Sequence, residues 1–247
     1  MNGLDLDILL PALAAGALVL ASHVPLGMRV LARGAIFIDL AVAQLAGLGV
    51  IIAGLLGLAG NMLAVQGMAV AAALLGAALL AYTERKHPKI QEASIGIVFV
   101  LAATLGMLLL SRDVHGGEHF KDLLAGQILW VSGDQLIAIA VLTVFLFVLW
   151  RTLRGRFGRL AFYGQFALAV TASVQLVGVY LVFASLIIPA LATRNYPRWR
   201  PAIAYGVGLA GYALGLALSG WLDWPAGPAI VWAMAFCGAA AMVWKRV

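Results

Sequence analysis

The sequence predicts an all-α protein, a polytopic bundle of about eight or nine transmembrane helices that forms one domain over residues 1–247. Of its 247 residues, 64% are hydrophobic and only 11% are charged, and the mean hydropathy is +1.04. A soluble domain is about 25% charged, because polar groups must cover its surface. One soluble core cannot bury this much apolar surface, so lipid is the solvent that the chain requires.

Long apolar runs predict the individual spans. A helix needs about 20 mainly apolar residues to cross the hydrocarbon core, where backbone groups must bond within the segment. The runs cover residues 8–28, 35–57, 62–83, 92–111, 136–150, 160–192, 201–221 and 228–244. The run 160–192 is too long for one crossing and contains Gly178 and Pro189, so we expect a span followed by a shorter returning helix. The short amphipathic stretch 119–132 is typical of a re-entrant or interfacial helix.

The basic residues predict the orientation. All of them except Arg112 and Lys121 lie in every second connection between the predicted spans or after the last span, which would place them on one side of the membrane. These residues are Arg29, Arg33, Arg85, Lys86, Lys89, Arg151, Arg154, Arg156, Arg159, Arg194, Arg198, Arg200, Lys245 and Arg246. Because cytoplasmic loops are enriched in Lys and Arg, we expect a multi-pass protein of a bacterial-type inner (cytoplasmic) membrane, with its N-terminus outside and its C-terminus cytoplasmic. This placement accounts for the +6 charge without a nucleic-acid partner.

Ionisable or polar groups within the spans are costly and therefore candidate functional residues. Asp39 and Gln44 lie in the second run; five residues correspond to about 500° of helix rotation, so on a regular helix they project about 140° apart. Asp39 is either a carboxylate that stabilises the helix start or a pathway residue. His23 is more typical of a histidine hydrogen-bonded between helices than of a ligand, and Glu92 suits the positive end of the fourth span.

Two loops carry the remaining candidates. On the outer side, Asp113, His115, Glu118 and His119 supply imidazole and carboxylate ligands that Zn²⁺ accepts, although an ordinary solvated loop would look similar. On the inner side, the basic segment 151–159 either sets the topology or docks a cytoplasmic partner. The sequence contains neither a Gly-x-x-x-x-Gly-Lys-Ser/Thr phosphate loop nor a His-Glu-x-x-His motif. If ATP powers transport, we expect another chain to bind it.

Four stretches of the sequence share a recognisable pattern. Residues 176–194 contain a Val-Gly-Val turn followed by Ile-Ile-Pro-Ala and a basic end, and residues 92–99 begin the fourth span with an acidic residue. Residues 124–132 read Leu-Ala-Gly-Gln-Ile-Leu-Trp-Val-Ser, and residues 222–230 read Leu-Asp-Trp-Pro-Ala-Gly-Pro-Ala-Ile. In their order along the chain, these stretches resemble the membrane permeases of zinc/manganese/iron ABC importers, the ABC-3 family. The first is similar to the hallmark run of that family, the third to its Phe-Gly-Asn-Ile-Leu-Gly-Val-Ser and the fourth to its Leu-Pro-x-Gly-Pro-x-Ile.

The resemblance implies a permease subunit that pairs with a second permease subunit, docks cytoplasmic ABC ATPase subunits and receives metal from an extracytoplasmic metal-binding protein. The chain itself would not be an enzyme and would hold no permanent cofactor; ATP would act only through the partner subunit. Its cargo would be a divalent transition metal, with zinc ahead of manganese or iron. The metal ligands and pathway residues would be Asp39, Gln44, His115, Glu118, His119, Gly178, Ser185 and Pro189.

The sequence departs from the family pattern in two places. Where the family has Gly-Asp-Ala-x-Ser-His, Gln44 occupies the histidine position and Asp39 lies one residue early; an amide oxygen is a weaker transition-metal ligand than imidazole. The segment between Arg151 and Gln175, where the family has its coupling helix, is shorter. The candidate ATPase-coupling residues there are Arg154, Arg156, Phe157 and Arg159.

Other functions predict different features. A stand-alone, ion-coupled secondary transporter needs a relay of buried carboxylates, and the spans contain few besides Asp39. An ABC permease for a non-metal cargo, such as an organic solute, is the other alternative.

Overall fold

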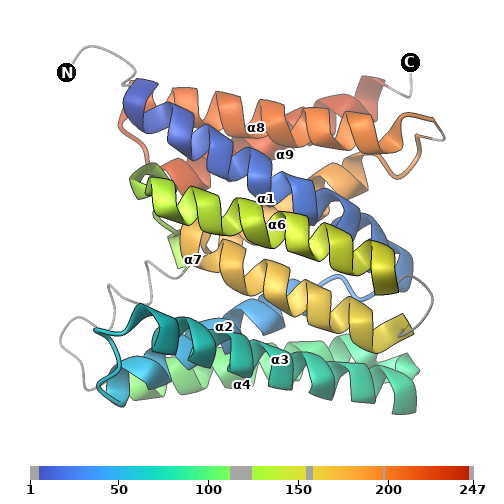
Figure 1. Cartoon of the computed structure of the whole chain (residues 1–247). Helices are drawn as coiled ribbons and strands as arrows, with labels where there is room; N and C mark the ends of the chain where they lie inside the picture. Colours follow the sequence, from blue (N-terminus) through green and yellow to red (C-terminus); the bar gives the residue numbers. More distant parts are fainter. Residues whose placement is uncertain (1–5, 112–123, 154–157, 197, 245–247) are drawn as a thin grey trace. The chain divides into compact units, whose positions relative to one another are not determined.

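The structure is a computed structural model that describes residues 6–111, 124–153, 158–196 and 198–244 (Figure 1). All regular secondary structure in these residues is helical. The helices are α1 Leu6–Arg33, α2 Ile38–Leu55, α3 Met62–Lys86, α4 Gln91–Leu110, α6 Gly133–Leu153, α7 Gly158–Ala192, α8 Arg200–Leu222 and α9 Ala226–Trp244. Two 3-10 turns, η1 Pro88–Ile90 and η2 Ile128–Trp130, complete them.

The described residues contain eight helices that are long and apolar enough to cross a membrane. The prediction of an all-α bundle with eight or nine membrane helices is therefore confirmed. Each predicted run corresponds to one of these helices, with ends that differ by a few residues. The agreement follows from the physics of lipid, because a span must satisfy its own backbone hydrogen bonds over a fixed thickness.

α7 is interrupted where the sequence predicts. Gly178 has φ 78° and ψ 165°, a non-helical conformation that separates two helical parts of α7. This backbone region is accessible essentially to glycine alone. Pro189 lies inside the second part.

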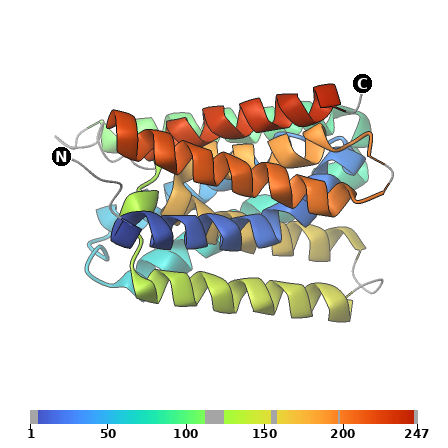
Figure 2. The same ribbon diagram turned by 90° about the horizontal axis from the view of Figure 1, so that it is seen from above.

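The chain divides into two compact units. Unit 1 contains α1, α8 and α9, with residues 124–145 and 173–192; unit 2 contains α2, α3 and α4, with residues 146–172. In unit 1, α8 and α9 lie side by side in both views (Figures 1 and 2). That both units form one permease domain stays a prediction.

Glycines allow the helices of each unit to approach closely. In unit 1, a Cβ atom on Gly27 of α1 would lie 1.9 Å from the carbonyl oxygen of Leu186, and one on Gly16 would meet the Tyr212 ring. In unit 2, a Cβ atom on Gly49 of α2 would lie 2.5 Å from the carbonyl oxygen of Met68 on α3. Small residues are typical of helix contacts in lipid, where association depends on close packing.

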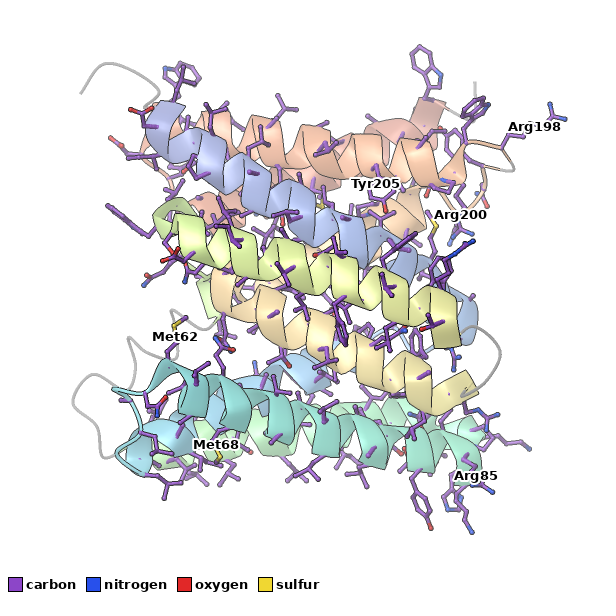
Figure 3. The ribbon with its side chains drawn as sticks, viewed as in Figure 1. Met62, Met68, Arg85, Arg198, Arg200 and Tyr205 are labelled. Carbon is purple, nitrogen blue, oxygen red and sulfur yellow. The ribbon has the colours of Figure 1, made fainter. Side chains whose placement is uncertain are left out.

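Basic side chains lie at helix ends. Arg85 belongs to the last turn of α3, and Arg198 and Arg200 lie at the beginning of α8 (Figure 3). Arg200 donates a hydrogen bond from Nη2 to the carbonyl oxygen of Ala190, at 3.5 Å. The predicted orientation across the membrane stays a prediction.

The contact between α8 and α9 generates a stability test. A Cβ atom on Gly215 would lie 2.3 Å from Cα of Ile230, whereas one on Gly206 of the same helix would meet nothing within 4 Å. We expect Gly215→Ala to lower the free energy of unfolding in detergent by about 1–3 kcal/mol, because backbone must move to admit the methyl group. Gly206→Ala should leave stability unchanged or raise it by up to about 1 kcal/mol. Equal effects of the two substitutions would contradict this packing.

Candidate functional site

Asp39 is a buried carboxyl group in the first turn of α2. Its side chain is 1% exposed, although it belongs to a membrane-spanning helix. The backbone amides of Asp39 and Leu40 lie close enough to interact with it, but neither carboxylate oxygen has a partner that meets hydrogen-bond geometry within the described residues. A buried polar group without such a partner costs free energy, so its retention requires an explanation.

Glu92 of α4 contacts the backbone of the turn that leads into α2. Its Oε1 atom accepts a hydrogen bond from the backbone N–H of Ile36, at 2.5 Å, in the turn that leads into α2. The carboxylates of Glu92 and Asp39 are close enough to interact electrostatically. The Oε2 atom of Glu92 is buried and has no hydrogen-bond partner among the described residues. Sequence reasoning treated Glu92 as a structural residue, and the only signal for more was its place in a family-like stretch.

Gln44 does not share a face of α2 with Asp39. α2 is continuous from Ile38 to Leu55, so five residues of regular helix separate their directions by about 140°. Gln44 is itself buried, with 8% of its side chain exposed. The two residues therefore do not form one ligand set on α2.

The outer ligand cluster lies outside the described residues. This applies to His115, Glu118 and His119, so their role as metal ligands stays a prediction. Within the described part of the chain, no group of three or more His, Cys, Asp and Glu side chains could hold a metal ion.

His23 lies buried in α1 and bonds within its own helix. Its Nδ1 atom lies 2.9 Å from the carbonyl oxygen of Val19 and 3.0 Å from Oγ of Ser22. Nε2 is buried and has no partner among the residues that the structure describes. The bond between helices that the sequence favoured is thus replaced by one inside α1.

Three of the four family-like stretches meet in unit 1. The Gly178 interruption of α7 packs against the loop before η2: a Cβ atom on Gly178 would lie 2.3 Å from the backbone nitrogen of Gly126, which also has a positive φ of 72°. A Cβ atom on Gly227 of α9 would lie 2.5 Å from the carbonyl oxygen of Ala125. Glycines in these three stretches therefore allow one shared close contact of backbone. The stretches are residues 124–132, 176–194 and 222–230.

The predicted pathway helix is firmly packed beyond this contact. Ser185 of α7 and Tyr212 of α8 are fully buried. The Oγ atom of Ser185 and the phenolic oxygen of Tyr212 share a hydrogen bond of 2.9 Å. Pro189 accepts a hydrogen bond through its carbonyl oxygen from the Thr193 hydroxyl, at 2.8 Å. These contacts position α7 in unit 1; a role in conduction for Gly178, Ser185 and Pro189 stays a prediction.

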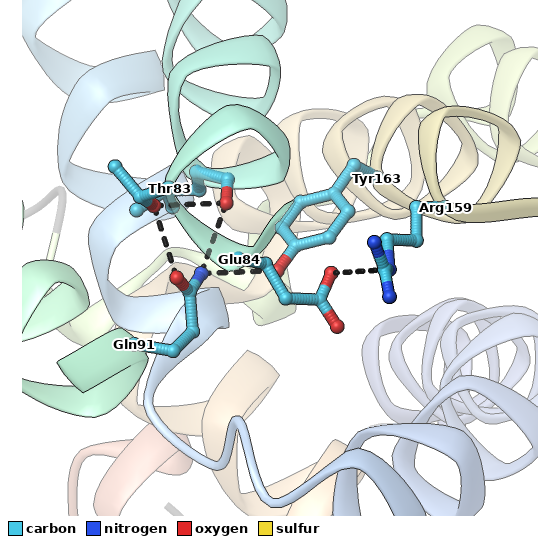
Figure 4. A network of polar contacts seen from close by, with 6 residues as sticks. Thr83, Glu84, Gln91, Arg159 and Tyr163 are labelled. Carbon is cyan, nitrogen blue, oxygen red and sulfur yellow. Dashed lines mark hydrogen bonds and ion pairs between the residues drawn. The ribbon is translucent and has the colours of Figure 1, made fainter. Parts of the chain in front are cut away.

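A polar network joins the start of α7 to α3 and α4 in unit 2 (Figure 4). The Gln91 amide nitrogen donates to the carbonyl oxygen of Leu80, at 3.0 Å, and to the hydroxyl of Tyr163, at 3.1 Å. The Thr83 hydroxyl donates to the Gln91 amide oxygen, at 2.9 Å. These bonds fix the beginning of α7 against the ends of two other helices.

An ion pair lies at the edge of this network. Nε of Arg159 is 3.9 Å from a carboxylate oxygen of Glu84, with side-chain exposures of 56% and 18%. Arg159 is thus the one predicted coupling residue that the structure describes, since Arg154, Arg156 and Phe157 lie outside the described residues.

The network generates a second stability test. We expect Gln91→Leu to lower the free energy of unfolding by about 1–3 kcal/mol, because Tyr163 loses a buried partner. Arg159→Gln should change it by at most about 1 kcal/mol, because the arginine is more than half exposed to solvent, which screens the pair. Unfolding of both purified variants in detergent, followed by circular dichroism, measures the difference. A larger loss for Arg159→Gln than for Gln91→Leu would show that the ion pair, and not the amide, holds α7.

Comparisons with known proteins agree with this architecture. Over 182 residues the chain is 25% identical to a probable iron transport system membrane protein of Haemophilus influenzae, covering 64% of this chain and 66% of that protein. Over 168 residues it is 27% identical to an uncharacterized membrane protein of Synechocystis sp., covering 59% of this chain and 60% of that protein. The matched stretch thus spans less than two thirds of either relative.

Solved structures show the same fold. The chain is similar to PsaBC from Streptococcus pneumoniae, solved in complex with a Fab, with a TM-score of 0.77 and 21% identity over 96% of this chain and 91% of that one. It is also similar to an inward-facing conformation of a putative metal-chelate type ABC transporter, with a TM-score of 0.67 and 19% identity over 96% and 85%. The model of the ABC 3 transport family matches residues 5–162 and 150–245. The chain therefore belongs to the ABC 3 transport family.

Proposed function

We propose that this chain is the membrane-spanning permease subunit of an ATP-driven importer of a divalent transition metal. The observation that carries the proposal is the family match along nearly the whole chain, in a helical bundle that retains a buried carboxylate at Asp39. An ionisable group kept inside a membrane domain is a functional candidate by default, because its burial is costly. A carboxylate that interacts with a cation crossing the bilayer would explain why this costly burial is retained.

The energy for import would come from a separate chain. Family membership makes this chain the membrane component of an ABC transporter, and ATP hydrolysis would occur in cytoplasmic ATPase subunits. Docking on the basic segment 151–159 would place the ATPase beside the start of α7. The Gln91–Tyr163 hydrogen bond would then pass a displacement of α7 to α4, within unit 2.

The remaining parts of the proposal follow the family arrangement. Both units would form one permease domain that pairs with a second permease subunit in a cytoplasmic-type membrane, with the N-terminus outside. An extracytoplasmic binding protein would deliver metal near His115, Glu118 and His119. The cargo would be zinc, manganese or iron; the similarity to a probable iron transport system membrane protein of Haemophilus influenzae supports a metal cargo.

Metal uptake in cells tests this proposal. Cells that lack the chain should accumulate less radiolabelled zinc, manganese or iron, and the wild-type chain should restore uptake only with a partner ATPase whose phosphate-loop lysine is intact. His119→Ala should slow restored uptake by about tenfold or more if His119 ligates the metal. His87→Ala, which removes an exposed histidine at the end of α3, is the matched control and should transport normally.

Unchanged accumulation of all three metals in the deleted cells would reject the proposal. Uptake of a metal chelate in place of the free ions would instead assign the chain to an ABC permease for another cargo.

A further inference from the structure

Two consecutive residues at the beginning of α4 connect three other segments of unit 2. The first, Gln91, is buried and bonds α3 through Thr83 and α7 through Tyr163 (Figure 4). The second, Glu92, accepts a hydrogen bond through Oε1 from the backbone N–H of Ile36, in the turn before α2. Successive residues of a helix project about 100° apart, so the two side chains reach different neighbours. The first turn of α4 is therefore a junction between α3, α7 and the turn that leads into α2.

A local role at the helix end does not account for these bonds. A carboxylate in the first turn can stabilise its own helix through the free N–H groups there. Glu92 Oε1 instead accepts from an amide 56 residues away in the chain. Gln91 likewise bonds Tyr163, which is 72 residues away. Both side chains thus hold separate segments of unit 2 together.

The path from α7 to α2 through these residues is short. A hydrogen bond joins Tyr163 to Gln91, a peptide bond joins Gln91 to Glu92, and a second hydrogen bond joins Glu92 to the turn before α2. Tyr163 is 1% exposed, so a displacement of α7 away from α4 would break a hydrogen bond that water cannot easily replace. Movement of the first turn of α4 together with α7 avoids that loss.

The other polar contact at this end of α7 is a weaker link. The ion pair between Arg159 and Glu84 joins α7 to α3 at 3.9 Å, and its arginine is more than half exposed. Exposed ion pairs of this kind contribute little, because solvent screens them. The bond between Gln91 and Tyr163 is shorter, at 3.1 Å, and both of its residues are buried.

We propose that Gln91 and Glu92 couple the beginning of α7 to the turn before α2, so that a movement of α7 imposed by the ATPase also moves α2. This inference rests on the proposed function, which places an ATPase beside the start of α7, and assigns the route of coupling within unit 2. Gln91 and Glu92 act as positioning residues, because their bonds go to other segments of the chain. The helix that they position carries the buried Asp39.

Hydrogen–deuterium exchange of the full chain in complex with its partner ATPase tests this coupling. Exchange in residues 34–37, the turn before α2, should change by about two- to tenfold when a non-hydrolysable ATP analogue binds, the range that one hydrogen bond supports. Tyr163→Phe removes the hydroxyl that bonds Gln91 and should abolish this response. Without nucleotide, Glu92→Ala should speed exchange in the turn by a similar factor, whereas Glu92→Gln, which keeps an oxygen acceptor, should stay close to the wild type.

Transport per ATP hydrolysed gives a second measurement, in liposomes that contain the chain, its ATPase and the external binding protein, with radiolabelled zinc, manganese and iron in separate assays. Tyr163→Phe and Glu92→Ala should each lower this ratio by about two- to tenfold. The double variant should lose no more than the worse single variant, because both substitutions interrupt one path. Ser94→Ala, which removes a hydroxyl that bonds the carbonyl oxygen of Ile90, is the matched control and should behave as the wild type does.

Three results would each overturn the inference: no response to nucleotide in the turn of the wild-type chain, an unchanged response in Tyr163→Phe, or losses that multiply in the double variant. The two measurements also keep the inference apart from the proposed function. If the response in the turn depends on Tyr163 but the liposomes take up none of the three metals, the coupling stands and the metal cargo is wrong. If ATP drives metal uptake but the turn responds independently of Tyr163, the function stands and the coupling is wrong.

Discussion

The absence of water in the bilayer core is the constraint on which the rest of this structure depends. Backbone groups in lipid must bond within their own segment, so the chain forms helices long enough to cross. Lipid also removes the hydrophobic drive that joins helices in water, which leaves close packing as the main source of contact. The glycines at the helix contacts follow directly, because only a missing side chain lets Gly27 meet the backbone at Leu186. Each polar group buried among these helices therefore needs an explanation for its burial.

The buried polar groups fall into two kinds. In the first kind, the groups satisfy one another: Ser185 bonds Tyr212, and Gln91 bonds Tyr163 and the backbone of α3. These groups hold helices in fixed positions, and a closed network is tolerable in a low dielectric. In the second kind, at Asp39 and Glu92, buried acceptors have no donor within the described chain. This second kind marks Asp39 and Glu92 as candidate functional residues.

Sequence reasoning predicted the parts of this fold that depend on local pattern. The spans were predictable because the thickness and apolarity of the lipid set their length and hydropathy. The interruption at Gly178 was predictable because a run of 33 residues is too long for a single crossing. The hydrogen bond between Glu92 and the Ile36 backbone was not, because it depends on the turn before α2 reaching α4. Likewise Gln91 and Tyr163 lie 72 residues apart, and nothing in either local pattern indicates their bond. The family-like stretches indicated which glycines matter, but only the structure explains that Gly126 and Gly178 contact each other.

In the proposed function, the chain conducts a cation but does not energise its transport, because its apolar helices carry too few ionisable groups to couple a second ion. Reconstitution into liposomes tests it most directly. With the chain alone, a proton or sodium gradient should drive no accumulation of Mn²⁺ or Zn²⁺ above the external concentration, and addition of the partner ATPase with ATP should start it. Accumulation against a concentration gradient by the chain alone, driven by either ion gradient, would contradict the claim.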